Sequence, residues 1–331
     1  MNASMPEPIP SPQPESISPT PTPQPPTTIF RGADGIRAGW RIVIYLALAA
    51  VVAFLLLLII ALLGRGRNFQ VAQITPLGTG LGEAAIFLVA AIPAVIMARV
   101  EHRKFGDYGL PVRLMPGRNF WIGVLTGFVC ISACLLGIFA FGGFHLTGLG
   151  IHGSAIPAAT FAWAIAFVMV GLAEEFSFRG YLQFTLTIGV GFWPSAFLLS
   201  ALFGLAHARN PGESNAGLVS VVLFGLLFCL FLRRTGNLWW AVGFHAGWDW
   251  GQTFVYGVPD SGMAPYHNLF NCDFAGPRWL TGGTVGPEAS IFTPIVLIIA
   301  AIIFSRVYRE SKYQAVSTPA QQTAKRISPE E

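Results

Sequence analysis

Three charged residues stand close together in a segment that otherwise has the composition of a membrane-spanning helix. Residues 171–183 contain Glu174, Glu175 and Arg179. A charged side chain in the bilayer core costs at least about 2.5–3.5 kcal/mol on insertion scales, so three of them require a compensating structure or a function. Glu175 and Arg179 are four residues apart, on one helical face where they can pair. Glu174 is rotated about 100° away from that face and has no such local partner.

Two later apolar segments carry polar groups that Glu174 could meet. The first contains His207, and the second contains His245 with Asp249 one helical turn further on. A carboxylate held in an apolar pocket is a stronger base than one in water, so Glu174 could activate a water molecule and later pass its proton to a leaving amine. His207 or His245 could stabilise the oxyanion of a tetrahedral intermediate. This chemistry is peptide hydrolysis within a membrane.

Asp249 and the pair Glu175–Arg179 have supporting roles in this hypothesis. Asp249 could orient the His245 imidazole or assist at the oxyanion, and Arg179 would neutralise Glu175. Each also has a structural interpretation, because ion pairs and hydrogen-bonded histidines hold membrane helices together. The combination favours a functional site, since Glu-Glu-x-x-x-Arg, Phe-x-x-x-His and His-x-x-x-Asp occur in this order on three separate segments.

A metal-assisted version of the same site is open as well. Glu174, His207 and His245 could supply three ligands to a divalent metal such as zinc, with water as the fourth ligand. The chain lacks the His-Glu-x-x-His helix of zinc proteases, and the two histidines lie on different segments. The residue spacing therefore leaves the cofactor open.

The composition predicts that these segments belong to an all-α, polytopic transmembrane bundle. Apolar residues make up 53% of the 331 residues and charged residues only 11%, whereas a soluble domain has about 25%. Because about 20 mostly apolar residues span a bilayer as a helix, we expect eight spans, at about residues 40–63, 81–98, 120–141, 157–186, 192–208, 217–232, 238–254 and 291–307. The fourth should continue past Arg179 to about Leu186, since residues 181–188 contain no helix breaker before Gly189. A nucleic-acid partner is not expected, because no basic patch with interleaved aromatic residues occurs.

Lysine and arginine residues predict the orientation of the bundle. Five of them lie between the second and third spans, and others precede the seventh span and follow the eighth, whereas residues 142–156 contain none. The positive-inside rule then places both termini in the cytoplasm, for an integral protein of the plasma membrane. We expect a disordered, proline-rich cytoplasmic tail at residues 1–38, a transmembrane domain at 39–310 and a disordered tail at 311–331.

The motifs resemble those of the CPBP intramembrane proteases, a family that includes type II CAAX prenyl endopeptidases and bacterial Abi-type proteins. The same three motifs occur there in the same order, and they match Glu174, Glu175, Arg179, Phe203, His207, His245 and Asp249. The resemblance covers about residues 168–249 well and implies a protease core at about 157–308.

The resemblance implies a role for each motif residue. Glu174 would activate water, Glu175 and Arg179 would support it, and the two histidines with Asp249 would complete the site. Family members often have Asn where this chain has Asp249. A carboxylate cannot donate a hydrogen bond to an oxyanion unless it is protonated, so an orienting or ligand role suits Asp249 better. The partner would be a membrane-associated peptide or protein in the lipid bilayer, such as a prenylated tail, a peptide precursor or a membrane-protein segment.

Two other classes of function use buried polar residues in the same way. A transporter or proton relay needs Glu, His and Asp inside a bundle, but no internal repeat supports it. A non-catalytic immunity or scaffold protein would act by binding alone, but such a protein would be free to lose Glu174. The sequence therefore favours the intramembrane peptidase over both.

Overall fold

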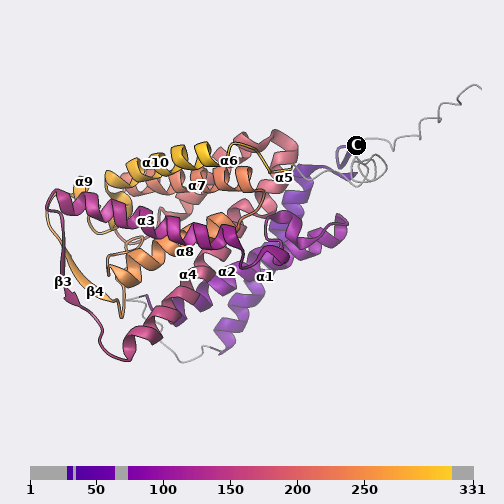
Figure 1. Ribbon diagram of the computed structural model, residues 1–331. Coiled ribbons are helices and arrows are strands. Elements are labelled where there is room, and N and C mark those ends of the chain that lie inside the picture. Colours follow the sequence, from indigo (N-terminus) through magenta and orange to yellow (C-terminus); the bar gives the residue numbers. More distant parts are fainter. Residues whose placement is uncertain (1–27, 33–34, 64–73, 315–331) are drawn as a thin grey trace, which may run out of the picture. The chain divides into compact units, whose positions relative to one another are not determined.

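The computed structural model describes residues 28–32, 35–63 and 74–314 (Figure 1). Most of the two predicted tails, residues 1–27 and 315–331, lies outside this range, and the predicted domain boundaries stay a prediction. The chain divides into residues 1–37 and 38–331. In the first unit, the short strands β1 (Arg31–Gly32) and β2 (Gly35–Ile36) pair in antiparallel fashion.

The second unit is a bundle of apolar helices. Its main helices are α1 (Ala38–Leu63), α2 (Pro76–Val100), α3 (Arg118–Ala140), α4 (Ala155–Arg179), α5 (Tyr181–Val190), α6 (Phe192–His207), α7 (Asn215–Thr235), α8 (Trp239–Asp249) and α10 (Phe292–Val307). Five stretches are long and apolar enough to cross a membrane, namely α1, α2, α3, α4 with α5, and α7; α6 and α10 are shorter apolar helices. A π-helical turn, η3 (Trp250–Val255), continues α8. Every predicted span coincides with helix, and the predicted all-α membrane bundle is confirmed.

The fourth predicted helix is interrupted at Gly180, which corrects the expectation of an unbroken helix. The ψ angle of Gly180 is −124°, outside the helical range, so α4 ends at Arg179 and α5 begins at Tyr181. A Cβ at Gly180 would collide with the carbonyl oxygen and ring of Phe176. Glycine is therefore required at this break, which allows α5 to leave the direction of α4.

The long connection between η3 and α10 contains regular structure that the sequence did not indicate. Strand β4 (Phe270–Phe274) pairs antiparallel with β3 (Phe144–Leu149), with a bulge between Leu146 and Gly148. The short helix α9 (Arg278–Thr281) and the 3₁₀ turn η4 (Pro287–Ala289) follow. Figure 1 shows β3 and β4 alongside each other at the same end of the helices as α9. This connection is thereby held against the helices.

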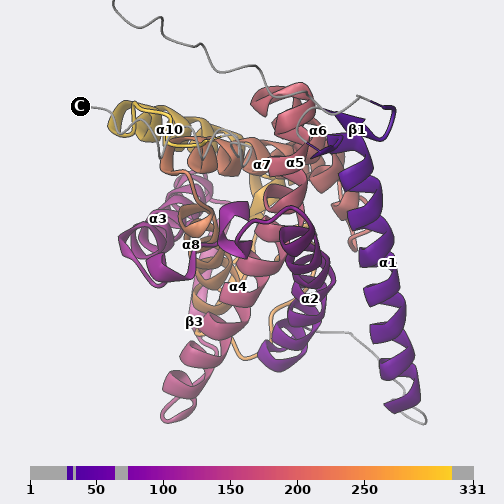
Figure 2. The same cartoon turned by 90° about the vertical axis from the view of Figure 1, so that its right-hand side faces the viewer.

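Helices α3 and α8 pack through glycines on both sides. Gly123 and Gly127 of α3 face the backbone of α8, and Gly243 and Gly247 of α8 face the backbone of α3. A Cβ at any of the four would overlap a carbonyl oxygen of the other helix. Small residues four apart let membrane helices approach this closely. The contact fixes α8, and α4 packs between α8 and α2 (Figure 2).

Glu101 joins several elements at the end of α2. Its carboxylate accepts hydrogen bonds from the hydroxyls of Tyr181 (2.6 Å) and Tyr108 (3.1 Å). The guanidinium groups of Arg103 and Arg41 lie 3.4 and 3.6 Å from the same carboxylate, and all three charged side chains are buried. One carboxylate thereby connects α1, α2, α5 and the 3₁₀ turn η1 (Phe105–Tyr108).

We expect Glu101→Gln to lower the free energy of unfolding by about 3–5 kcal/mol, because it removes the negative charge that faces two buried guanidinium groups. Thermal and urea unfolding in detergent measure this. Tyr181→Phe is the control, since it removes a single hydrogen bond to this carboxylate and should cost about 1.5–3 kcal/mol. Equal unfolding curves for the two variants would show that the charge of Glu101 does not hold these elements together.

Candidate active site

A cavity of about 510 Å³ contains most of the candidate residues. Helices α2, α4, α6, α7 and α8 line it together with residues 260–263 and Glu288. Glu174, His207, His245 and Asp249 all lie in its wall. Glu175 and Arg179 are fully buried and do not line the cavity. The structure thus brings four of the six candidate residues to one space and puts the other two behind it.

The imidazole of His245 lies among three carboxylates. Its Nδ1 is 3.0 Å from Oε1 of Glu175, and because a carboxylate only accepts, Nδ1 carries a proton and donates to it. Its Nε2 lies 3.6 Å from Oε2 of Glu174 and 3.5 Å from Oδ2 of Asp249. The ring stacks on Phe228 with 5.3 Å between ring centroids. These contacts fix the ring and leave Nε2 as the nitrogen next to Glu174.

His207 has a defined tautomer for the same reason. Its Nδ1 lies 2.8 Å from the backbone carbonyl oxygen of Phe203, one turn earlier in α6. The carbonyl accepts, so Nδ1 carries the proton and Nε2 of the neutral ring is an acceptor. The Phe203 ring packs edge-on against the imidazole, 4.7 Å away. His207 can therefore offer an unprotonated nitrogen to the cavity that it lines.

Arg179 pairs with Glu175, as its spacing predicts. The guanidinium lies 3.6 Å from Oε1 of Glu175, and both side chains are fully buried. Three aromatic rings surround it, with centroids 4.3 Å (Phe203), 5.7 Å (Phe178) and 5.8 Å (Phe228) away. Cation–π contacts of this kind stabilise a desolvated arginine. The pair therefore supports His245, because Glu175 is also the acceptor for Nδ1.

The cavity is also lined by three acidic residues that the sequence motifs do not include, namely Glu83 on α2, Asp260 and Glu288. Glu83 is the one acidic residue of α2. Its Oε2 is buried and receives no hydrogen bond from the residues that the structure describes. A lone carboxylate in an apolar helix is the same signal that identified Glu174, so this residue could have been found. Asp260 and Glu288 lie in the long connection, where a carboxylate carries no such signal.

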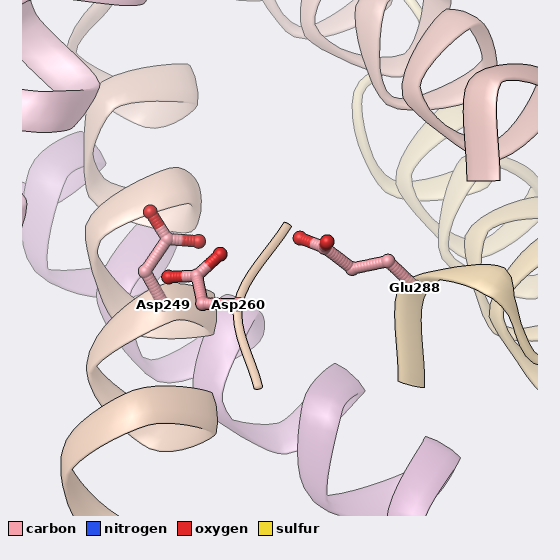
Figure 3. Close-up of side chains that lie close together, drawn as sticks. All are labelled: Asp249, Asp260 and Glu288. Atoms are coloured by element: carbon pink, nitrogen blue, oxygen red, sulfur yellow. The ribbon is translucent and has the colours of Figure 1, made fainter. Parts of the chain in front are cut away.

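Asp249, Asp260 and Glu288 form a cluster of carboxylates. One oxygen of each lies within 4.8 Å of the others, and Figure 3 shows Glu288 directed towards the two aspartates. Asp260 accepts a hydrogen bond from Thr253 (2.9 Å), and Glu288 accepts two from the amide and hydroxyl of Ser261 (3.0 and 3.1 Å). Burial raises the pKa of Asp260 to about 6. Burial, assisted by the charge of Asp260, raises the pKa of Glu288 to about 8.

The raised pKa of Glu288 predicts how stability depends on pH. Between its ordinary value of 4.5 and about 8, the folded protein holds this proton whereas the unfolded chain has lost it. The folded state therefore binds more protons over this range, and stability falls as the pH rises through it. We expect Glu288→Gln, which keeps an acceptor for Ser261, to match wild type near pH 5 and to melt at a higher temperature near pH 9.

Melting curves in detergent across this pH range test the expectation. Glu310→Gln is the matched control, because Glu310 is exposed. A Glu288→Gln protein that loses stability with rising pH as steeply as wild type and Glu310→Gln would contradict the account.

The three residues that could hold a divalent metal, Glu174, His207 and His245, are not among the sets whose ligand atoms all lie within 4.8 Å of one another. Each histidine has one ring nitrogen held by a protein acceptor and one available, which suits metal binding. Among the residues that the structure describes, the three possible ligands whose atoms do lie within 4.8 Å of one another are Asp249, Asp260 and Glu288. Oxygen ligands alone suit Mg²⁺, Mn²⁺ or Ca²⁺ rather than Zn²⁺. The set Glu174, His207 and His245 stays a prediction, which the chelator sensitivity of cleavage tests.

Fold and cavity define an integral membrane protein with a polar site inside an apolar bundle. A family model described as type II CAAX prenyl endopeptidase, Rce1-like, matches residues 156–251. The matched segment runs from α4 to η3 and contains all three motifs. The match supports the resemblance to the CPBP/CAAX proteases that the motifs predict, over this segment of the chain. No curated protein matches the chain.

Proposed function

We propose that the protein is an intramembrane endopeptidase in which Glu174 activates water to hydrolyse a peptide bond of a membrane-associated substrate. The observation that supports this most is the position of Glu174 next to Nε2 of His245 (3.6 Å), in a cavity that His207 also lines. A base, a second proton acceptor and an oxyanion donor are the groups that peptide hydrolysis by water requires.

The reaction begins with a water molecule between Glu174 and His207. Glu174 takes one proton from it, and Nε2 of His207 accepts a hydrogen bond from the other. The oxygen attacks the peptide carbonyl carbon, so that a C–O bond forms and the carbonyl oxygen becomes an oxyanion. Glu174 then delivers its proton to the amide nitrogen, and the C–N bond breaks to give a carboxylic acid and an amine. The acid passes its remaining proton to the amine, so the products are a carboxylate and an ammonium group, and Glu174 is again a carboxylate.

His245 stabilises the oxyanion in this mechanism. Nδ1 donates to Glu175, so an Nε2–H requires the imidazolium form, whose charge three neighbouring carboxylates balance. Asp249 orients the ring by its contact with Nε2 and does not itself donate. Arg179 balances the charge of Glu175. The two act through His245 and are positioning residues.

A transporter or proton relay is the rival, because it uses the same buried groups. The experiment is to incubate the purified protein with a library of membrane-soluble peptides in detergent and to identify new termini by mass spectrometry. The same protein is then tested for substrate or proton flux in proteoliposomes. New termini without flux support the peptidase. Flux without new termini would replace it by the rival.

The same proposal includes the orientation in the plasma membrane, with both termini cytoplasmic. The orientation is supported by contacts that bring the segments rich in lysine and arginine to the same side of the bundle. The amides of Lys312 and Tyr313 donate to the carbonyl oxygen of Arg233 (3.1 and 3.0 Å), and the amide of Leu238 donates to the carbonyl oxygen of Gly109 (2.8 Å). Cysteines introduced at Asp107 and Asp273 should differ in labelling by an impermeant maleimide in intact cells. Only Asp273→Cys should react.

A further inference from the structure

The cavity is lined by more acidic than basic side chains. Among the residues that the structure describes, five acidic side chains line it and no lysine or arginine does. The proposed mechanism uses Glu174 and, through His245, Asp249. It assigns no role to Glu83, Asp260 or Glu288. The basic groups in the wall are the two histidines. Arg179 lies behind the wall, and its charge is paired with Glu175.

Two of these carboxylates lack hydrogen-bond donors. The Asp249 side chain is 7% exposed and receives no hydrogen bond from the described part of the chain, and its ionic contact is the 3.5 Å approach to His245. The buried Oε2 of Glu83 receives none there either. An unsatisfied carboxylate in a desolvated wall is costly. The cost is relieved when a ligand brings positively charged N–H donors, which make the strongest hydrogen bonds to carboxylates.

We propose that the cavity selects substrates that carry a lysine or arginine side chain close to the scissile bond and disfavours a free carboxylate there. Asp249, Asp260 and Glu288 are the groups that would receive the cation, since one oxygen of each lies within 4.8 Å of the others. Asp249 also lies 3.5 Å from Nε2 of His245, so the cation is bound about one side chain away from the reacting carbonyl. The inference rests on the proposed proteolysis and adds its substrate class.

This substrate class differs from a prenylated C-terminus. A C-terminal Cys-a-a-X motif ends in a free carboxylate within three residues of the cysteine. Charges of one sign in a low-dielectric cleft concentrate the opposite charge and repel their own. One oxygen each of Asp249, Asp260 and Glu288 lies within 4.8 Å of the others, so a further carboxylate beside this cluster would be opposed. An internal, cationic segment of a membrane peptide fits this cavity better.

The test uses matched membrane peptides that differ at one position next to the scissile bond. Lys, Gln and Glu are compared there, and a second pair compares an amidated with a free C-terminus three residues beyond the bond. We expect wild type to cleave the Lys peptide with a kcat/KM about ten-fold or more above that of the Glu peptide, and the amide above the free acid. The double variant Asp260→Asn, Glu288→Gln should bring the Lys/Glu ratio close to one, mainly through KM, and still cleave the Gln peptide.

Controls separate this inference from the proposed function. Asp273→Asn with Glu310→Gln removes two exposed carboxylates and should keep the wild-type ratio. Binding of the same peptides to Glu174→Gln protein measures the charge preference without cleavage. Equal affinity for the Lys and Glu peptides would overturn the inference, whatever the outcome for proteolysis. Preferred binding of the Lys peptide without cleavage of any peptide by wild type would overturn the proposed function alone. Loss of the preference on adding Mg²⁺ or Ca²⁺, with activity that requires the ion, would assign the cluster to a metal and overturn the inference as well.

Discussion

Glu174→Gln is expected to lower kcat for peptide cleavage by about 10²–10⁴-fold while KM and the melting temperature change little. Glutamine has the same shape and can still contact His245, but its amide cannot take a proton from water. Steady-state kinetics of the purified protein in detergent measure the effect. The loss should appear in kcat, because the base acts in the transition state rather than in substrate binding.

Glu310→Gln is the matched control for this result, since the same change at an exposed position should leave kcat intact. Melting curves of both variants exclude unfolding as the cause of a loss. A Glu174→Gln protein with wild-type kcat would mean that another group activates the water, and the assignment of Glu174 would be wrong.

The second large effect is expected where α3 and α8 meet. Gly127→Leu should lower the free energy of unfolding by about 3 kcal/mol or more, because its side chain would overlap the carbonyl of Phe244 and the amide of Trp248. Separation of the two helices would also move His245 and Asp249, which α8 carries, so cleavage should be lost as well. Unfolding curves and activity are measured on the same preparation.

Gly82→Ala is the control for that substitution. Nothing lies within 4 Å of a Cβ at Gly82 of α2, so alanine should be neutral or should stabilise the helix by up to about 1 kcal/mol. If Gly127→Leu unfolds at the same denaturant concentration as Gly82→Ala, the two helices do not depend on this close approach.

The helices and the motif residues could be predicted from the sequence because both are local properties. A run of apolar residues is sufficient to predict a span, and the four-residue spacing of Glu175–Arg179 places the pair on one face. The predicted pair is present at 3.6 Å. The meeting of Glu174 and His245 was inferred only from their comparable depth in two spans, and the structure has them 3.6 Å apart.

The features of the site that the sequence does not predict depend mainly on contacts between segments that are far apart in the chain. Asp260 and Glu288 lie close to Asp249 although they are on the long connection after η3, whose strand β4 pairs with the distant β3, and no local pattern encodes these contacts. The break at Gly180 was missed because one glycine between two helical segments is a weak signal. Glu83 was missed although its isolated charge was visible in α2.

Hydrolysis in ¹⁸O-labelled water under single-turnover conditions shows whether water activated by Glu174 is the nucleophile. Wild type is expected to place ¹⁸O in the new C-terminal carboxylate of the cleaved peptide, and Glu174→Gln protein, folded and able to bind the peptide, is expected to form almost no product in the same time. Labelled product formed equally fast by both proteins would show that Glu174 does not activate the water, and product whose new carboxylate carries no label would show that water is not the nucleophile.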